Sequence, residues 1–169
     1  MIIAAAIGLL ALALVYELSR TSEASTVITD PTQPEPRGLR NNNPGNIVYS
    51  AANNWQGQVG TDGKYAIFSD PYYGIRAMFK VLSSYRKKGI SSISAIIIRW
   101  APKEDNEHVS EYINFVTKNS HMRSPLTEVP GNKQYANIVA AIIQFENGYN
   151  PFALQYIKDI GAQFPVVPE

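Results

Sequence analysis

The sequence predicts a mainly α-helical (α+β) protein, in which an N-terminal transmembrane helix precedes a compact domain of four to five helices with a small β-hairpin region. Three observations support this fold class. Residues 1–16 carry no charged side chain. Four or five later stretches repeat apolar side chains at helical spacing. The turn at Thr61-Asp62-Gly63-Lys64 separates two short extended segments, which is typical of a β-hairpin.

Composition limits the class of protein. The chain has 169 residues, of which 45% are hydrophobic and 17% charged, so one domain of ordinary size and an appendage are expected. The formal net charge is only +1, which argues against nucleic acid as the main partner. There is no cysteine, which excludes disulfides, thiolate metal sites and cysteine nucleophiles.

The domain boundaries follow changes in composition. Residues 1–20 are expected to form a retained, single-pass anchor in a lipid membrane. A cleaved signal peptide is the alternative, although no Lys or Arg precedes the apolar run. Residues 21–36 are rich in Ser, Thr and Pro and are expected to be a linker. Residues 37–165 form the globular domain, and residues 166–169 a tail.

Helix boundaries are marked by local signals. Asp70 as N-cap and Pro71 after it begin a helix that ends before Gly89. Further helices are expected at about 93–100, 106–119, 133–147 and 152–163. Short extended segments are expected at 48–49, 55–57 and 65–68.

Residues 37–47 read Arg-Gly-Leu-Arg-Asn-Asn-Asn-Pro-Gly-Asn-Ile. Asparagine and glycine tolerate left-handed backbone, so a structured loop is expected rather than a helix or a strand. The amides of Asn43 and Asn46 could bind sugar hydroxyl and acetamido groups. The alternative is that these amides only hold the loop together.

Glu146 is the candidate catalytic residue. Val139, Ile142, Ile143 and Glu146 follow the i, i+3, i+4, i+7 spacing, so the acid lies on the apolar face of a helix that ends at Gly148. Apolar surroundings and the negative end of the helix dipole should both raise its pKa. A carboxylic acid that is neutral near pH 7 is the proton donor that glycoside cleavage needs. The alternative is a structural glutamate at a helix end.

Other residues are candidates for the same site. Tyr49, Trp55 and Tyr149 could bind a sugar chain, and aromatic rings that close the core are the alternative. Asp62 and Glu104 are the alternatives to Glu146 as acidic residues of the site. A metal site using His108 and His121 has little support, because no second pair of ligands lies at helical spacing. We expect neither a metal nor a cofactor.

Four segments resemble a family of phage and prophage proteins, described as virion structural proteins of membrane-containing icosahedral phages such as corticoviruses. They are residues 37–47, Trp-Gln-Gly at 55–57, Tyr-Ala-Ile-Phe-Ser-Asp-Pro-Tyr-Tyr-Gly-Ile-Arg-Ala at 65–77, and Ile-Ile-Arg-Trp-Ala-Pro at 97–102. The resemblance covers about residues 37–150. It implies a virion protein, located in the virion membrane or the host cell membrane.

A second likeness concerns chemistry. Glu146-Asn147-Gly148-Tyr149-Asn150-Pro151 resembles the Glu-Ser-Gly-x-Asn-Pro signature of lytic transglycosylases and glucosaminidases of the lysozyme-like superfamily. Asn147 stands where those families have serine. In those families a loop comparable to residues 43–47 follows the glutamate, whereas in this sequence the loop precedes it. The likeness implies a lysozyme-like domain that binds or cleaves peptidoglycan glycan strands, with Glu146 as general acid. The alternative is a non-catalytic protein that links the viral membrane to capsid proteins.

Overall fold

The computed structural model describes residues 34–102, 108–122, 125–126 and 133–163. The chain divides into two units, Met1–Gln33 and Pro34–Glu169, and all described residues belong to the second. The predicted anchor at 1–20 therefore lies outside the described residues, as does the linker up to residue 33. Within the described part, no helix combines the length and apolar character needed to cross a membrane.

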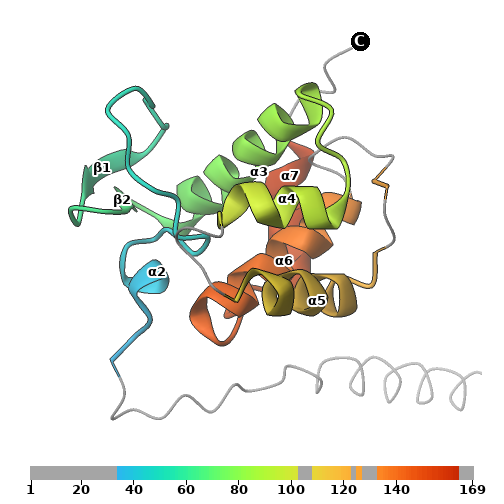
Figure 1. Ribbon diagram of the computed structural model, residues 1–169. Coiled ribbons are helices and arrows are strands. Elements are labelled where there is room, and N and C mark those ends of the chain that lie inside the picture. The colour runs from blue at the N-terminus through green and yellow to red at the C-terminus, as the bar shows by residue number, and fades with distance from the viewer. Residues whose placement is uncertain (1–33, 103–107, 123–124, 127–132, 164–169) are drawn as a thin grey trace, which may run out of the picture. The chain divides into compact units, whose positions relative to one another are not determined.

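The described unit is mainly helical, with one small antiparallel hairpin (Figure 1). Its six helices are α2 (Arg37–Arg40), α3 (Pro71–Lys87), α4 (Ile93–Trp100), α5 (Val109–Asn119), α6 (Lys133–Asn147) and α7 (Leu154–Ala162). The helix α6 contacts α2, α3, α5 and α7, so it is the central element of the helical part (Figure 1).

The helix ends confirm the capping signals. The Asp70 side chain accepts a hydrogen bond from the Tyr72 amide at the start of α3. The Ser92 hydroxyl accepts from the Ala95 amide at the start of α4. Gly148, directly after α6, has a φ of 77°, which is the left-handed conformation expected where a helix stops.

The hairpin pairs β1 (Gln58–Thr61) with β2 (Ala66–Phe68). The carboxylate of Asp62 accepts from the amides of Lys64 and Tyr65 and so closes the turn. An isolated bridge joins Val48 to Tyr65 and extends the β-region by one residue pair.

Two predictions about local structure were wrong. Residues 37–40 form the one-turn helix α2, where a loop was expected. Residues 55–57 were expected to be extended, but they form a turn before β1. The first prediction was wrong because the Asn and Gly residues that follow the short helix suggested a loop.

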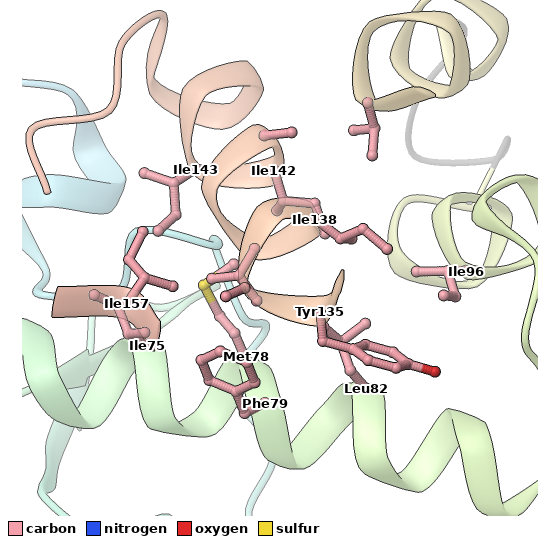
Figure 2. Packing of buried hydrophobic residues seen from close by; sticks show 14 of the residues in the cluster. Ile75, Met78, Phe79, Leu82, Ile96, Tyr135, Ile138, Ile142, Ile143 and Ile157 are labelled. Carbon is pink, nitrogen blue, oxygen red and sulfur yellow. The ribbon is translucent and has the colours of Figure 1, made fainter. Parts of the chain in front are cut away.

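The core lies between α3 and α6. Ile75, Met78, Phe79 and Leu82 point from α3 toward α6, as Figure 2 shows. They belong to one buried cluster with Tyr135, Ile138 and Ile142 of α6, and all seven side chains are fully buried. Each buried side chain of this size contributes about 1.5–3 kcal/mol to the stability of the fold. This packing fixes α6, and therefore the end of α6 that carries Glu146.

Gly74 allows the Asn-rich loop, which consists of residues 41–47 after α2, to lie against α3. A Cβ atom at this position would collide with the backbone carbonyl of Asn42. The loop is thus held against the first turns of α3, while the Asn42 amide donates to the carbonyl of Phe68 in β2 (3.0 Å).

Replacing Gly74 by alanine should therefore destabilise the protein, although Gly→Ala in a helix normally stabilises by roughly 0.5–1 kcal/mol. We expect a net loss of about 1–3 kcal/mol, as for other overpacked sites. Urea unfolding would measure it. Gly60→Ala is the matched control, because open space surrounds a Cβ at that position. Equal stability of the two variants would contradict the close contact.

Candidate functional site

Glu146 lies in the last turn of α6, one residue before the helix ends. Its side chain is largely buried, on the face of α6 that its apolar spacing predicts. Phe145 beside it stacks on the ring of Tyr112, with ring centroids 3.7 Å apart. The carboxyl group is thus held at the boundary between the core and the surface.

Three donors from three different segments converge on this carboxyl group. The Asn46 amide donates to Oε2 at 2.9 Å, and the Tyr112 hydroxyl donates to Oε1 at 2.8 Å. The Trp100 indole N–H is the third donor. The Asn-rich loop, the end of α4 and the helix α5 therefore all meet at the end of α6.

Burial and hydrogen bonding act on the pKa of Glu146 in opposite directions. Burial raises it above the ordinary value of 4.5, and the bonds from Asn46, Tyr112 and Trp100 lower it. Burial is the larger effect, so the net result is a raised pKa. Burial and the neighbouring Glu146 also raise the pKa of Tyr112, which keeps its hydroxyl protonated as a donor.

Glu146 faces a cavity of about 250 Å³, which we call the inner cavity. Its lining comes from the Asn-rich loop, the hairpin, the end of α4 and α6, with residues Asn46, Val48, Lys64, Tyr65, Trp100, Ala101, Pro102 and Glu146. A second, more open hollow of about 500 Å³, the outer groove, shares four of these residues: Asn46, Val48, Trp100 and Pro102. The two hollows therefore adjoin each other, and Glu146 lines the inner cavity.

Glu146 is the sole acidic residue among the described residues that line either hollow. The charged residues that accompany it are all basic: Lys64 in the inner cavity, and Lys88 and Arg99 in the outer groove. Because the carboxyl group has a raised pKa and an open hollow before it, it can donate a proton to a bound molecule.

The predicted amides divide into two roles. Asn46, with a φ of 49°, contacts Glu146 and lines both hollows. Asn43 is fully buried; its amide donates to the carbonyls of Ile47 and Ala66, and its oxygen accepts from the Ile47 amide, each at 2.9 Å. The predicted role of Asn43 in substrate binding does not fit this position, because its hydrogen bonds all serve the loop.

Asn147 joins the end of α6 to the same loop. Its amide donates to the carbonyl of Pro44 at 2.7 Å and to that of Ile143 at 2.8 Å. Gly38 fits closely beside it, since a Cβ there would lie 2.6 Å from Oδ1 of Asn147 and 2.9 Å from Oδ1 of Asn46. Any larger residue would displace the amide that holds Glu146.

The alternative acids do not take part in this arrangement. Asp62 pairs with Arg37 and also accepts from the Asn41 amide, each at 2.6 Å. The hydrogen bond from Arg37, together with backbone amides, holds the pKa of Asp62 well below its usual range. Such a carboxylate is a poor proton donor. Glu104 lies outside the described residues.

The predicted aromatic residues also separate. Trp55 lines the outer groove and packs against the core. Tyr49 is exposed beside the hairpin and Tyr149 is half-buried in the turn after α6, and neither lines the inner cavity or the outer groove. In the described ranges, no group of three or more His, Asp or Glu side chains is placed to hold a metal ion.

The sequence analysis did not identify the contacts of Tyr112 and Trp100 with Glu146. A signal was available for Tyr112, because a tyrosine on a buried face needs a partner for its hydroxyl. The partner itself lies 34 positions further along the chain, and spacing alone does not reveal it.

No protein-family profile matches the chain. It is 38% identical over 145 residues to Protein P5 of Pseudoalteromonas phage PM2, an alignment that covers 82% of this chain and 89% of that protein. The chain belongs to the Protein P5 family.

Membership in the Protein P5 family confirms the resemblance to phage proteins that residues 37–47 and the three later segments predicted. The aligned region is longer than the predicted extent of that resemblance. The likeness to lysozyme-like transglycosylases is not shown by this match.

The raised pKa of Glu146 leads to a prediction about stability. The folded protein holds the Glu146 proton more tightly than the unfolded chain does, so stability should fall as the pH rises from the ordinary pKa of 4.5 through the raised folded value. Glu146→Gln abolishes this titration. We expect the variant to gain stability relative to the unmodified protein as the pH rises above the ordinary pKa.

Thermal unfolding at several pH values would measure this difference. Glu111→Gln is the control, because Glu111 is an exposed glutamate on α5. A stability difference between Glu146→Gln and the unmodified protein that does not change with pH would contradict the raised pKa.

Proposed function

We propose that the described unit is a peptidoglycan-cleaving domain of a phage particle, with Glu146 as its general acid. The observation that supports this most directly is the combination at Glu146: a carboxyl group with a raised pKa, oriented by three donors, that lines the inner cavity. Cleavage of a glycosidic bond needs such a proton donor beside a site that admits a sugar chain.

The proposed reaction uses Glu146 twice. Its proton passes to the glycosidic oxygen as the bond from that oxygen to the muramyl C1 breaks. The resulting carboxylate then takes the proton of the muramyl 6-hydroxyl while that oxygen bonds to C1, which closes an anhydro ring and restores the neutral acid. The three donors stabilise the carboxylate between the two steps.

This transglycosylase course fits the lining better than hydrolysis does. A hydrolase of the usual kind needs a second carboxylate to activate water or to act as nucleophile. Glu146 is the one acid in the described lining, and Asp62 is engaged with Arg37. The ring-closing reaction needs no second carboxylate.

Membership in the Protein P5 family supports a phage protein, and a virion location is part of this proposal. The apolar segment at 1–20 would anchor the chain in the virion membrane or the host cell membrane as a single pass, and the linker at 21–36 would let the domain reach the cell wall. The second candidate, a non-catalytic link between the viral membrane and capsid proteins, is equally compatible with family membership.

Glu146→Gln should abolish cleavage. Removing a general acid typically costs a factor of about 10²–10⁴ in rate, so release of soluble fragments from purified peptidoglycan should fall at least about a hundredfold. Glu111→Gln is the control with the same change of charge. Undiminished release by Glu146→Gln would exclude this residue, and no release by the unmodified protein would leave the non-catalytic role.

Tyr112→Phe should shift the pH profile. Its hydroxyl stabilises the charged form of Glu146, so its removal raises the pKa of Glu146 further and moves the alkaline limit of activity to higher pH. The rate below that limit should fall, because the carboxylate loses one donor. Tyr135→Phe removes a buried hydroxyl from the same core and should leave the profile unchanged. Identical profiles for the two variants would contradict the role of Tyr112.

A further inference from the structure

The outer groove combines two features that a sugar site needs, aromatic faces and polar side chains. Trp55 and Trp100 both line it, together with the amides of Asn46 and Asn53 and the hydroxyl of Ser84. The C–H faces of pyranose rings pack on aromatic rings, while amides and hydroxyls bind the ring substituents. A hollow of about 500 Å³ lies within the range of ordinary ligand sites.

The basic side chains add a third feature. Lys88 lies directly after α3, and Arg99 lies in the last turn of α4. Both are exposed, both line the outer groove, and neither forms an ion pair with another described residue. The helix dipole favours a basic residue near the C-terminal end of any helix. It does not explain why the two come together in one groove that contains no described acid of its own.

The four residues that line both hollows suit an extended ligand. The outer groove adjoins the inner cavity at the four residues that line both, and Glu146 lines the inner cavity. A chain that occupies the outer groove can therefore continue past the carboxyl group. The basic side chains would then contact substituents of the sugar unit next to the bond that reacts.

We infer that the outer groove is a subsite for the acidic sugar unit of the strand, with its ring against Trp55 and Trp100 and its carboxylate substituents on Lys88 and Arg99. The inference rests on the proposed function and narrows its substrate class. The domain takes glycan strands in which the lactyl groups, or the peptides attached to them, carry free carboxylates, and it discriminates against neutral chains of N-acetylglucosamine. Charge-assisted contacts from lysine and arginine supply the discrimination.

The chain contains two tryptophans, and both line this groove. Their fluorescence therefore reports binding there without any need for turnover. The experiment uses the full chain with Glu146→Gln, in a detergent without a sugar head group, so that the strand is not cut. The probes are soluble peptidoglycan strands, the same strands with their carboxyl groups converted to amides, and a neutral N-acetylglucosamine oligomer.

We expect the unmodified strands to change the fluorescence, and the amidated strands to bind roughly tenfold more weakly, as the loss of two charge-assisted contacts would produce. Lys88→Gln and Arg99→Gln should each weaken binding of the unmodified strands by about threefold and reduce its salt dependence. Lys87→Gln is the matched control, since Lys87 is an exposed neighbour that does not line the groove.

Equal binding of the free and amidated strands, or equal effects of Lys88→Gln and Lys87→Gln, would overturn the inference and leave the cleavage proposal standing. Charge-dependent binding together with no cleavage by the unmodified chain would support the subsite and remove the catalytic function. Absence of any fluorescence change with all three probes would overturn the inference, because no strand would then enter the groove.

Discussion

The carboxyl group of Glu146 joins four parts of the described fold. Asn46, Trp100 and Tyr112 reach it from the Asn-rich loop, the end of α4 and the helix α5. A buried carboxylate without such donors costs several kcal/mol, so these contacts allow an ionisable group to remain at this depth. Burial favours the neutral acid and the donors favour the anion. In the proposed reaction Glu146 first gives up a proton and later accepts one, and this balance keeps both its neutral and its charged form accessible.

The sequence predicted most helices because their signals are local. The N-cap at Asp70, the stop at Gly148 and the apolar stripe of α6 each depend on residues a few positions apart, and the structure confirms them. The site is different. Asn46 lies 100 positions before Glu146, and only tertiary packing brings them together. Asn43 and Asn46 are similar in local composition, yet one is consumed by the loop and the other faces the hollow. The backbone turn between Asn43 and Asn46 decides which amide faces the hollow, and the residue types alone do not reveal that turn.

Net charge was also a poor guide to local electrostatics. A formal charge of +1 for the whole chain predicts no strong field. In three dimensions, Lys64 lines the inner cavity and Lys88 and Arg99 line the adjoining outer groove, while the carboxylate of Asp62 is paired with Arg37. The basic lining would be invisible in any count along the chain. It arises because the ends of α3 and α4 and the hairpin border the same space.

The bond between Asn147 and Pro44 spans 103 positions and lies beside the bond from Asn46 to Glu146. Bringing together two residues so far apart in the sequence costs chain entropy, and this cost is offset only when the intervening helices have packed. During synthesis on the ribosome, the loop emerges first and waits for a partner that is translated about a hundred codons later. A chain that has not yet been translated as far as Glu146 therefore contains the Asn-rich loop but lacks the carboxyl group. The hydrogen-bonded arrangement around Glu146 is therefore complete only after translation has passed the end of α6, a consequence of chain connectivity.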